Sequence, residues 1–87
     1  MSNVNIVLWS KVGCSYCQDV KAFFSEKNIS YTEVDVTEHD DRRDILETKY
    51  NVRYVPVIEI GKDGKYTGVT ELGLDALTKE LQAQGVL

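Results

Sequence analysis

Cys14 and Cys17, the two cysteines of the chain, are separated by only two residues. They follow the apolar stretch 5–10, which predicts a strand, and they precede a segment in which Val20 and Phe24 recur at helical spacing. Residues three positions apart at the start of a helix lie on one face, so the two thiols can meet. The residue types and their spacing therefore predict a disulfide that forms and opens reversibly.

The two cysteines are predicted to have different roles. A thiolate attacks a disulfide, and Cys14 is the better candidate because unpaired N–H groups, the helix dipole and nearby Lys11 should lower its pKa. Cys17 lies one turn into the helix, on the face shared with Val20 and Phe24, which predicts a more buried thiol with a higher pKa. Cys14 is therefore the expected nucleophile and Cys17 the resolving thiol.

A structural zinc site is the main alternative use of the cysteine pair. Such sites need four ligands, and the one further candidate is His39, within the acidic stretch 38–41. This set falls short of four, so we predict no metal site and interpret His39 as a solvated surface residue. A second alternative, two buried and inert cysteines, is also compatible with the spacing.

Length and composition are those of a single globular domain spanning residues 1–87. Of the 87 residues, 43% are hydrophobic and 28% charged, and the formal net charge is −4. An acidic balance argues against a nucleic-acid partner, which needs clustered Lys and Arg. No apolar run approaches the roughly 18 residues of a membrane span, and the first residues resemble no secretion signal. We therefore expect a monomer in the cytoplasm.

Strand-like and helix-like patterns alternate along the chain and predict an α/β fold. The expected strands cover residues 4–10, 31–36, 56–60 and 65–69, and the expected helices cover residues 15–27, 40–50 and 71–84. The first strand is apolar on both faces, so it should lie in the middle of the sheet and parallel to the second strand. Asp63-Gly64 predicts a two-residue hairpin turn between the last two strands.

Several residues indicate where these elements begin and what they bury. Thr37 or Asp40 is the expected N-cap of the second helix. Pro56 cannot donate a ladder hydrogen bond, so it is expected at the first position of its strand. An apolar stripe along the third helix should pack on the sheet; it consists of Leu74, Leu77 and Leu81.

The segment 11–17, Lys-Val-Gly-Cys-Ser-Tyr-Cys, followed some forty residues later by Val55-Pro56, resembles the glutaredoxin family. The resemblance covers essentially the whole chain, in the order strand, cysteine motif, helix, strand, helix, Val-Pro, hairpin, Gly68 and helix. It implies a thioredoxin fold, with a four-stranded mixed sheet flanked by three helices. It also implies a dithiol enzyme that uses glutathione.

The resemblance further implies a groove for glutathione beside the cysteine pair. In the family the Val-Pro bond is cis and lies beside the nucleophile, and the residue before the proline pairs its backbone with the cysteinyl part of glutathione. A lysine meets a carboxylate, an aromatic residue walls the groove, and the segment before the last helix holds the γ-glutamyl end. The groove residues so implied, with Tyr54 as their neighbour, are Lys11, Tyr16, Tyr54, Val55, Pro56, Gly68, Val69 and Thr70.

Simpler interpretations and departures from the family leave alternatives open. Gly68 is also explained by a turn that needs a positive φ, and Tyr54 and Tyr66 by packing. Tyr54 stands where threonine is common, and Thr67 where glycine is common. The segments 53–57 and 66–68, which contain these residues, resemble the redoxins that donate electrons to class Ib ribonucleotide reductases and are recharged by thioredoxin reductase. Thr70 favours glutathione, since glutathione-binding members have a short polar side chain there.

A cofactor-bound state is a further alternative. Ser15 replaces the proline that is frequent between the cysteines, and family members with a small residue there can assemble a [2Fe-2S] cluster between two protomers. Each protomer then contributes its first cysteine, and two glutathione thiols complete the ligand set. An exposed Cys14 is chemically suited to this, because iron–sulfur clusters are held by thiolates.

The predicted function is that of a dithiol glutaredoxin, a glutathione-dependent thiol-disulfide oxidoreductase. It would reduce protein disulfides and glutathione mixed disulfides, and so serve cell redox homeostasis and electron transfer. The expected partners are glutathione and disulfide-containing or glutathionylated proteins, without nucleic acid or membrane. Ribonucleotide reductase is the partner under the redoxin alternative.

Overall fold

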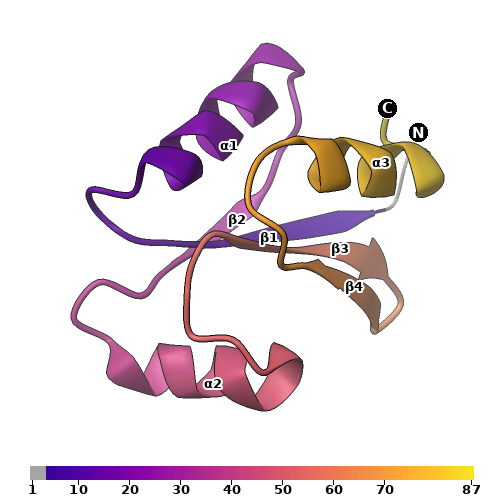
Figure 1. Cartoon of the computed structure of the whole chain (residues 1–87). Coiled ribbons are helices and arrows are strands. Elements are labelled where there is room, and N and C mark those ends of the chain that lie inside the picture. The colour runs from indigo at the N-terminus through magenta and orange to yellow at the C-terminus, as the bar shows by residue number, and fades with distance from the viewer. Residues whose placement is uncertain (1–3) are drawn as a thin grey trace.

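The computed structural model describes residues 4–87, which form a four-stranded mixed sheet covered by helices on both faces (Figure 1). The strands, in the spatial order β2-β1-β3-β4, are β1 (Asn5–Ser10), β2 (Thr32–Asp35), β3 (Val57–Lys62) and β4 (Lys65–Val69). β1 is parallel to β2, whereas the pairs β1–β3 and β3–β4 are antiparallel. One face carries α1 (Ser15–Glu26) and α3 (Asp75–Ala83), and the other carries α2 (Asp40–Tyr50). Within residues 4–87, no helix is both long and apolar enough to cross a membrane.

Most element boundaries agree with the sequence pattern, and α3 is the main exception. The helix predicted over 71–84 begins only at Asp75. Gly73 has a φ of +94°, which a right-handed helix cannot contain, and residues 71–74 form bends instead. The predicted hairpin turn is confirmed, because Asp63 and Gly64 have φ values of +55° and +78°, the positive values that a two-residue turn requires.

The start of α2 corrects a second prediction. Neither Thr37 nor Asp40 is the N-cap: the exposed His39 holds that position and makes no capping hydrogen bond through its side chain. The Thr37 hydroxyl instead accepts a hydrogen bond from the N–H of Val12 at 2.9 Å, and the Thr37 N–H donates to Oδ1 of Asp35 at 2.8 Å. The connection between β2 and α2 is thereby tied to the loop that follows β1.

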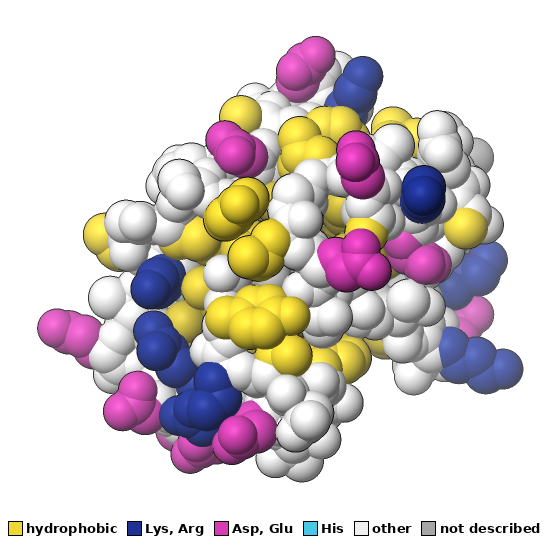
Figure 2. Space-filling model, in the orientation of Figure 1, with side chains coloured by type: hydrophobic (Ala, Val, Ile, Leu, Met, Phe, Trp, Pro, Cys, Tyr) yellow, Lys and Arg dark blue, Asp and Glu magenta, His cyan; other side chains and the backbone are white. Residues whose placement is uncertain are grey.

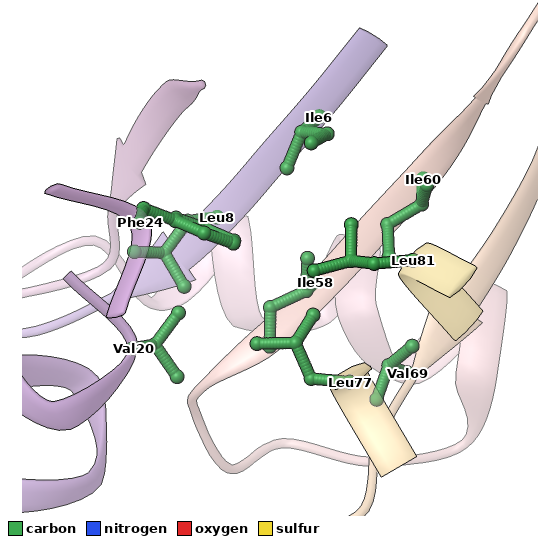
Figure 3. Close-up of a cluster of buried hydrophobic side chains, with 9 residues drawn as sticks. All are labelled: Ile6, Leu8, Val20, Phe24, Ile58, Ile60, Val69, Leu77 and Leu81. Atoms are coloured by element: carbon green, nitrogen blue, oxygen red, sulfur yellow. The ribbon is translucent and has the colours of Figure 1, made fainter. Parts of the chain in front are cut away.

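Apolar side chains pack against both faces of the sheet. The cluster between the sheet, α1 and α3 is shown in Figure 3 and comprises Ile6, Leu8, Val20, Phe24, Ile58, Ile60, Val69, Leu77 and Leu81. A second cluster, beneath α2, comprises Trp9, Val36, Leu46 and Val57. β1 contributes to both clusters, so its predicted central position is confirmed. The stripe along α3 is fully buried at its last two positions, whereas Leu74 is only partly buried at the edge.

A charged side chain lies inside the second cluster. Glu59 on β3 is only 5% exposed. Its Oε1 accepts from Nε1 of Trp9 at 2.7 Å, and its Oε2 accepts from the Tyr50 hydroxyl at 2.5 Å and from Nζ of Lys49 at 3.0 Å. Burial raises the pKa of Glu59, but the three hydrogen bonds outweigh burial and hold that pKa below its ordinary value. Glu59 therefore joins β1, β3 and α2 as a buried carboxylate with partners on both oxygens.

Gly68 on β4 is required by this arrangement and not by a turn. It stands opposite Glu59 in the hairpin, and its φ lies outside the left-handed region. A Cβ at this position would overlap the ring of Tyr50. The interpretation of Gly68 as a positive-φ turn residue is therefore wrong, and its missing side chain makes room for the ring whose hydroxyl reaches Glu59.

Glu59 should make the stability of the fold depend on pH. Because its folded pKa lies below the ordinary value of 4.5, the ionised carboxylate contributes stability above that value, and the contribution is lost as the pH falls through the folded pKa. We expect the free energy of urea unfolding to decline between about pH 5 and pH 3 more steeply in the wild-type protein than in Glu59→Gln, which cannot titrate at this position. Equal pH dependence of the unfolding free energy in the two proteins would show that Glu59 does not have a lowered pKa in the folded state.

Gly68→Ala should destabilise the fold by about 1–3 kcal/mol, the usual cost of forcing extra atoms into a packed site. The added methyl group meets the Tyr50 ring, so the loss in the double variant Gly68→Ala/Tyr50→Ala should be smaller than the sum of the two single losses. Chemical denaturation of the four proteins measures this coupling. Additive losses would show that the two positions do not touch.

Candidate active site

The cysteine pair lies where the chain passes from β1 into α1. Cys14 and Cys17 form a disulfide, with Cys14 as the N-cap of α1 and Cys17 in its first turn. The Sγ of Cys14 accepts a hydrogen bond from the N–H of Cys17 at 3.0 Å. Once the disulfide is opened, a donor in this position stabilises negative charge on the Cys14 sulfur, as does the positive end of the helix.

Burial distinguishes the two sulfur-bearing residues. Cys17 is fully buried and Cys14 is 8% exposed, which confirms the predicted order of burial. The expectation of an exposed Cys14 is wrong for this oxidised state, because the Cys14 sulfur is bonded to Cys17 and lies 4.0 Å from the carbonyl oxygen of Val55. The lowered pKa of Cys14 concerns the reduced protein and stays a prediction.

Strand pairing places Val55 beside Cys14. β1 and β3 are antiparallel, with Trp9 opposite Val57, so the end of β1 and the start of β3 meet at one edge. The Val55-Pro56 bond is cis, as the resemblance implied, and Pro56 lies one residue before β3 and not within it. Within residues 4–87 the Val55 N–H has no hydrogen-bond partner, and its carbonyl oxygen has none beyond the contact with Cys14. An extended substrate backbone can pair with such free groups.

Exposed apolar side chains surround this edge. Tyr16 and Tyr54 are each 46% exposed, Val12 is 75% exposed, and Lys11 is exposed in the same loop. Figure 2 shows hydrophobic side chains gathered between the start of α1 and the loops that precede β3 and follow β4. Tyr54 does more than pack, because its hydroxyl donates a hydrogen bond to the carbonyl oxygen of Thr70 at 2.8 Å.

The remaining predicted groove residues lie at the end of β4 and the start of the next loop. The Val69 side chain is buried in the core and Gly68 lies against Tyr50, so these two residues can offer a ligand only main-chain groups. Thr70 follows β4, is half-buried, and already accepts the bond from Tyr54 through its carbonyl. The structure thus brings the predicted residues to one edge of the sheet, with main-chain groups predominating.

The residues that hold α2 and the loop before Cys14 in place next to this edge were not identified from the sequence. Glu59 and the Tyr50 ring hold α2 against the strands next to Cys14, and Thr37 holds the loop before it. One signal was present: Glu59 interrupts the apolar strand 57–60, and a charged residue inside a buried strand needs partners. Nothing in the sequence marked which residues those partners are.

The described residues contain no side-chain cluster that supports metal binding by a single chain. Among residues 4–87, no group of three or more His, Cys, Asp and Glu side chains could hold an ion. The alternative of a [2Fe-2S] cluster takes one cysteine from each of two protomers, so this finding does not test it. It requires reduced Cys14, because the sulfur of a disulfide offers iron no thiolate, and it stays a prediction.

Known proteins resemble the chain in sequence and in structure. A family model described as glutaredoxin matches residues 6–65. The N-acetyl-S-hydroxy-L-cysteine reductase of Bacillus subtilis (strain 168) is 53% identical over 74 residues, which are 85% of this chain and 80% of that protein.

Two solved structures show the same fold. The crystal structure of the thioredoxin-like protein BC3987 is 25% identical and superposes with a TM-score of 0.69, covering 86% of this chain and 97% of that one. The solution structure of reduced glutaredoxin C1 from Populus tremula x tremuloides is 26% identical and superposes with a TM-score of 0.69, covering 98% of this chain and 70% of that one. The predicted thioredoxin fold is confirmed. With a redox-active Cys-x-x-Cys disulfide at the start of α1, the chain is a thiol-disulfide oxidoreductase that belongs to the glutaredoxin family.

Proposed function

We propose that this chain is a dithiol reductase for sulfenic acids of small cysteine derivatives, of which N-acetyl-S-hydroxy-L-cysteine is the type. The observation that carries the proposal is the pairing of a reactive sulfur, at Cys14, with the free main-chain groups of Val55 4.0 Å away. An acylated cysteine presents one amide beside its sulfur and fits such an edge. The 53% identity to a reductase of this substrate supports the same conclusion.

The reaction needs both cysteines in the reduced state. The Cys14 thiolate attacks the sulfenyl sulfur, the S–O bond breaks, and the oxygen leaves as water after taking up protons. The resulting mixed disulfide joins Cys14 to the substrate cysteine. Cys17 then attacks the Cys14 sulfur and expels the substrate as a thiol, which leaves the Cys14–Cys17 disulfide of the structure. The substrate sulfur gains two electrons and the cysteine pair loses two.

Three residues are suited to hold the substrate during this attack. The N–H and C=O of Val55 can pair with the acetamide, and exposed Lys11 can attract the carboxylate. The half-exposed ring of Tyr16 offers an apolar wall.

Residues 1–87 act as a single domain in this proposal. A dithiol that must be kept reduced suits the cytoplasm, where thiols are maintained.

The electron donor that restores the dithiol is either glutathione or thioredoxin reductase. Tyr54 favours thioredoxin reductase, because a tyrosine there resembles the redoxins that this enzyme recharges; its bond to the Thr70 carbonyl oxygen occupies neither the N–H nor the hydroxyl of Thr70. Glutathione dependence, glutathionylated partners and ribonucleotide reductase stay predictions from the resemblance.

Cys17→Ser should accumulate the mixed disulfide between Cys14 and the substrate, because the resolving thiol is missing. After addition of N-acetyl-S-hydroxy-L-cysteine released from a stable precursor, mass spectrometry of the intact protein should show one N-acetylcysteinyl group. Cys14→Ser serves as the control and should show none. An adduct on Cys17 in that control would show that Cys17 is the nucleophile and Cys14 the resolving thiol. If neither variant formed an adduct, the proposed attack on the sulfenic acid would be wrong.

Two recycling assays identify the electron donor. The oxidised protein is mixed with NADPH and either thioredoxin reductase, or glutathione together with glutathione reductase, and NADPH consumption is followed with the substrate present. We expect faster consumption with thioredoxin reductase. Equal or faster consumption with glutathione would re-establish the glutathione-dependent function that the resemblance implies.

A further inference from the structure

The loop that presents Val55 is fixed at both of its ends. At the first end, Tyr50 closes α2 and its hydroxyl donates to buried Glu59. At the second, the Tyr54 hydroxyl donates to the carbonyl oxygen of Thr70, a contact we name the Tyr54–Thr70 latch. The latch joins the segment that enters β3 to the segment that leaves β4, so it closes one end of the edge on which Val55 offers its main-chain groups.

A hollow lies beside the Thr70 end of the latch. It has a volume of about 200 Å³ and is lined by Thr67, Gly68, Val69, Thr70, Glu71, Ala76 and Glu80. Thr70 is shared by the latch and the hollow, so the two meet at this residue. Tyr54 is the neighbour of Val55 in the chain and is bonded to a residue that lines this space, so its ring is suited to limit how far a substrate paired with Val55 extends toward β4.

We propose that Tyr54 sets the upper size of the substrate by closing the groove after one acylated cysteine. The inference rests on the proposed function and names its substrate class: single cysteine derivatives in place of longer cysteinyl peptides. N-acetylcysteine ends at its acetyl group, so it pairs with Val55 while the latch stays closed. A tripeptide such as glutathione continues past its cysteinyl amide by a whole γ-glutamyl unit and must break the latch to bind.

Two chromogenic disulfides with the same leaving group test this limit without any electron donor. One joins N-acetylcysteine to thionitrobenzoate and the other joins glutathione to thionitrobenzoate. Reduced Cys14 attacks the cysteinyl sulfur and releases coloured thionitrobenzoate, after which Cys17 expels the cysteinyl thiol. The measured quantity is the ratio of the two second-order rate constants, so a general change in thiol reactivity cancels.

Wild-type protein should favour the N-acetylcysteine probe, and Tyr54→Phe should reduce that preference by about fivefold, the factor that corresponds to one lost hydrogen bond. Tyr54→Thr, which also removes the ring, should reduce it further. Tyr66→Phe is the matched control, because Tyr66 is 40% exposed on β4, and its hydroxyl makes no hydrogen bond with residues 4–87. Its ratio should equal that of the wild type. Thermal unfolding checks that all variants are folded.

The outcomes separate this inference from the function on which it rests. If wild-type protein reduces the N-acetylcysteine probe, but the ratio is the same in both Tyr54 variants, the size limit is wrong and the proposed function survives. If wild-type protein prefers the glutathione probe, the size limit is also overturned. If it reduces neither probe, the size limit is overturned, and the mixed-disulfide experiment with N-acetyl-S-hydroxy-L-cysteine decides the proposed function separately. A lower ratio of the N-acetylcysteine rate constant to the glutathione rate constant in the Tyr54 variants, with an unchanged ratio in Tyr66→Phe, establishes that the latch limits the size of the substrate.

Discussion

The active edge depends on the antiparallel register of β1 and β3. Because Trp9 stands opposite Val57, the residues that follow β1 and those that precede β3 meet, and Cys14 lies beside Val55. A slip of one residue would send every side chain of β3 to the opposite face of the sheet. It would bring the charge of Glu59 into the apolar cluster beneath α1 and α3. The pairing of the redox sulfur with a main-chain edge is thus a consequence of strand register.

Glu59 helps to hold that register and carries it to the loop. Its hydrogen bond with the Trp9 indole crosses from β3 to β1, where the two residues are diagonal neighbours. Its bond with Tyr50 fixes the last residue of α2, after which Asn51 turns the chain with a φ of +61°. The loop to Val55 therefore starts from a defined point. A leucine in place of Glu59 would fill the same space without directing Trp9 or Tyr50.

The sequence predicted the layers of the fold because its periodicities are strong, and it failed where a tertiary contact overrides a local preference. The two-faced burial of β1, the hairpin at Asp63-Gly64 and the order of burial of the cysteines all followed from pattern and spacing. Thr37 has the chemistry of an N-cap, but its hydroxyl accepts from Val12, a residue 25 positions away. Gly68 looked like a turn residue because its real constraint, the Tyr50 ring, arrives from another element. Local rules cannot anticipate partners that only the finished fold brings together.

The division of labour at the active edge follows from which groups are main chain and which are side chain. Cys14 caps α1, where its sulfur accepts the N–H of Cys17, and the carbonyl oxygen of Val55 lies 4.0 Å from that sulfur. Main-chain groups depend on the fold more than on the side chains, so under the proposed function they serve cysteinyl substrates in general. Selection among those substrates must come from side chains around the edge. Tyr54 is suited to this because it is half-exposed, lies next to Val55 and bonds across to a different loop. Under the proposed size limit, a change there would alter which cysteine derivative is accepted while the sulfur chemistry stays the same.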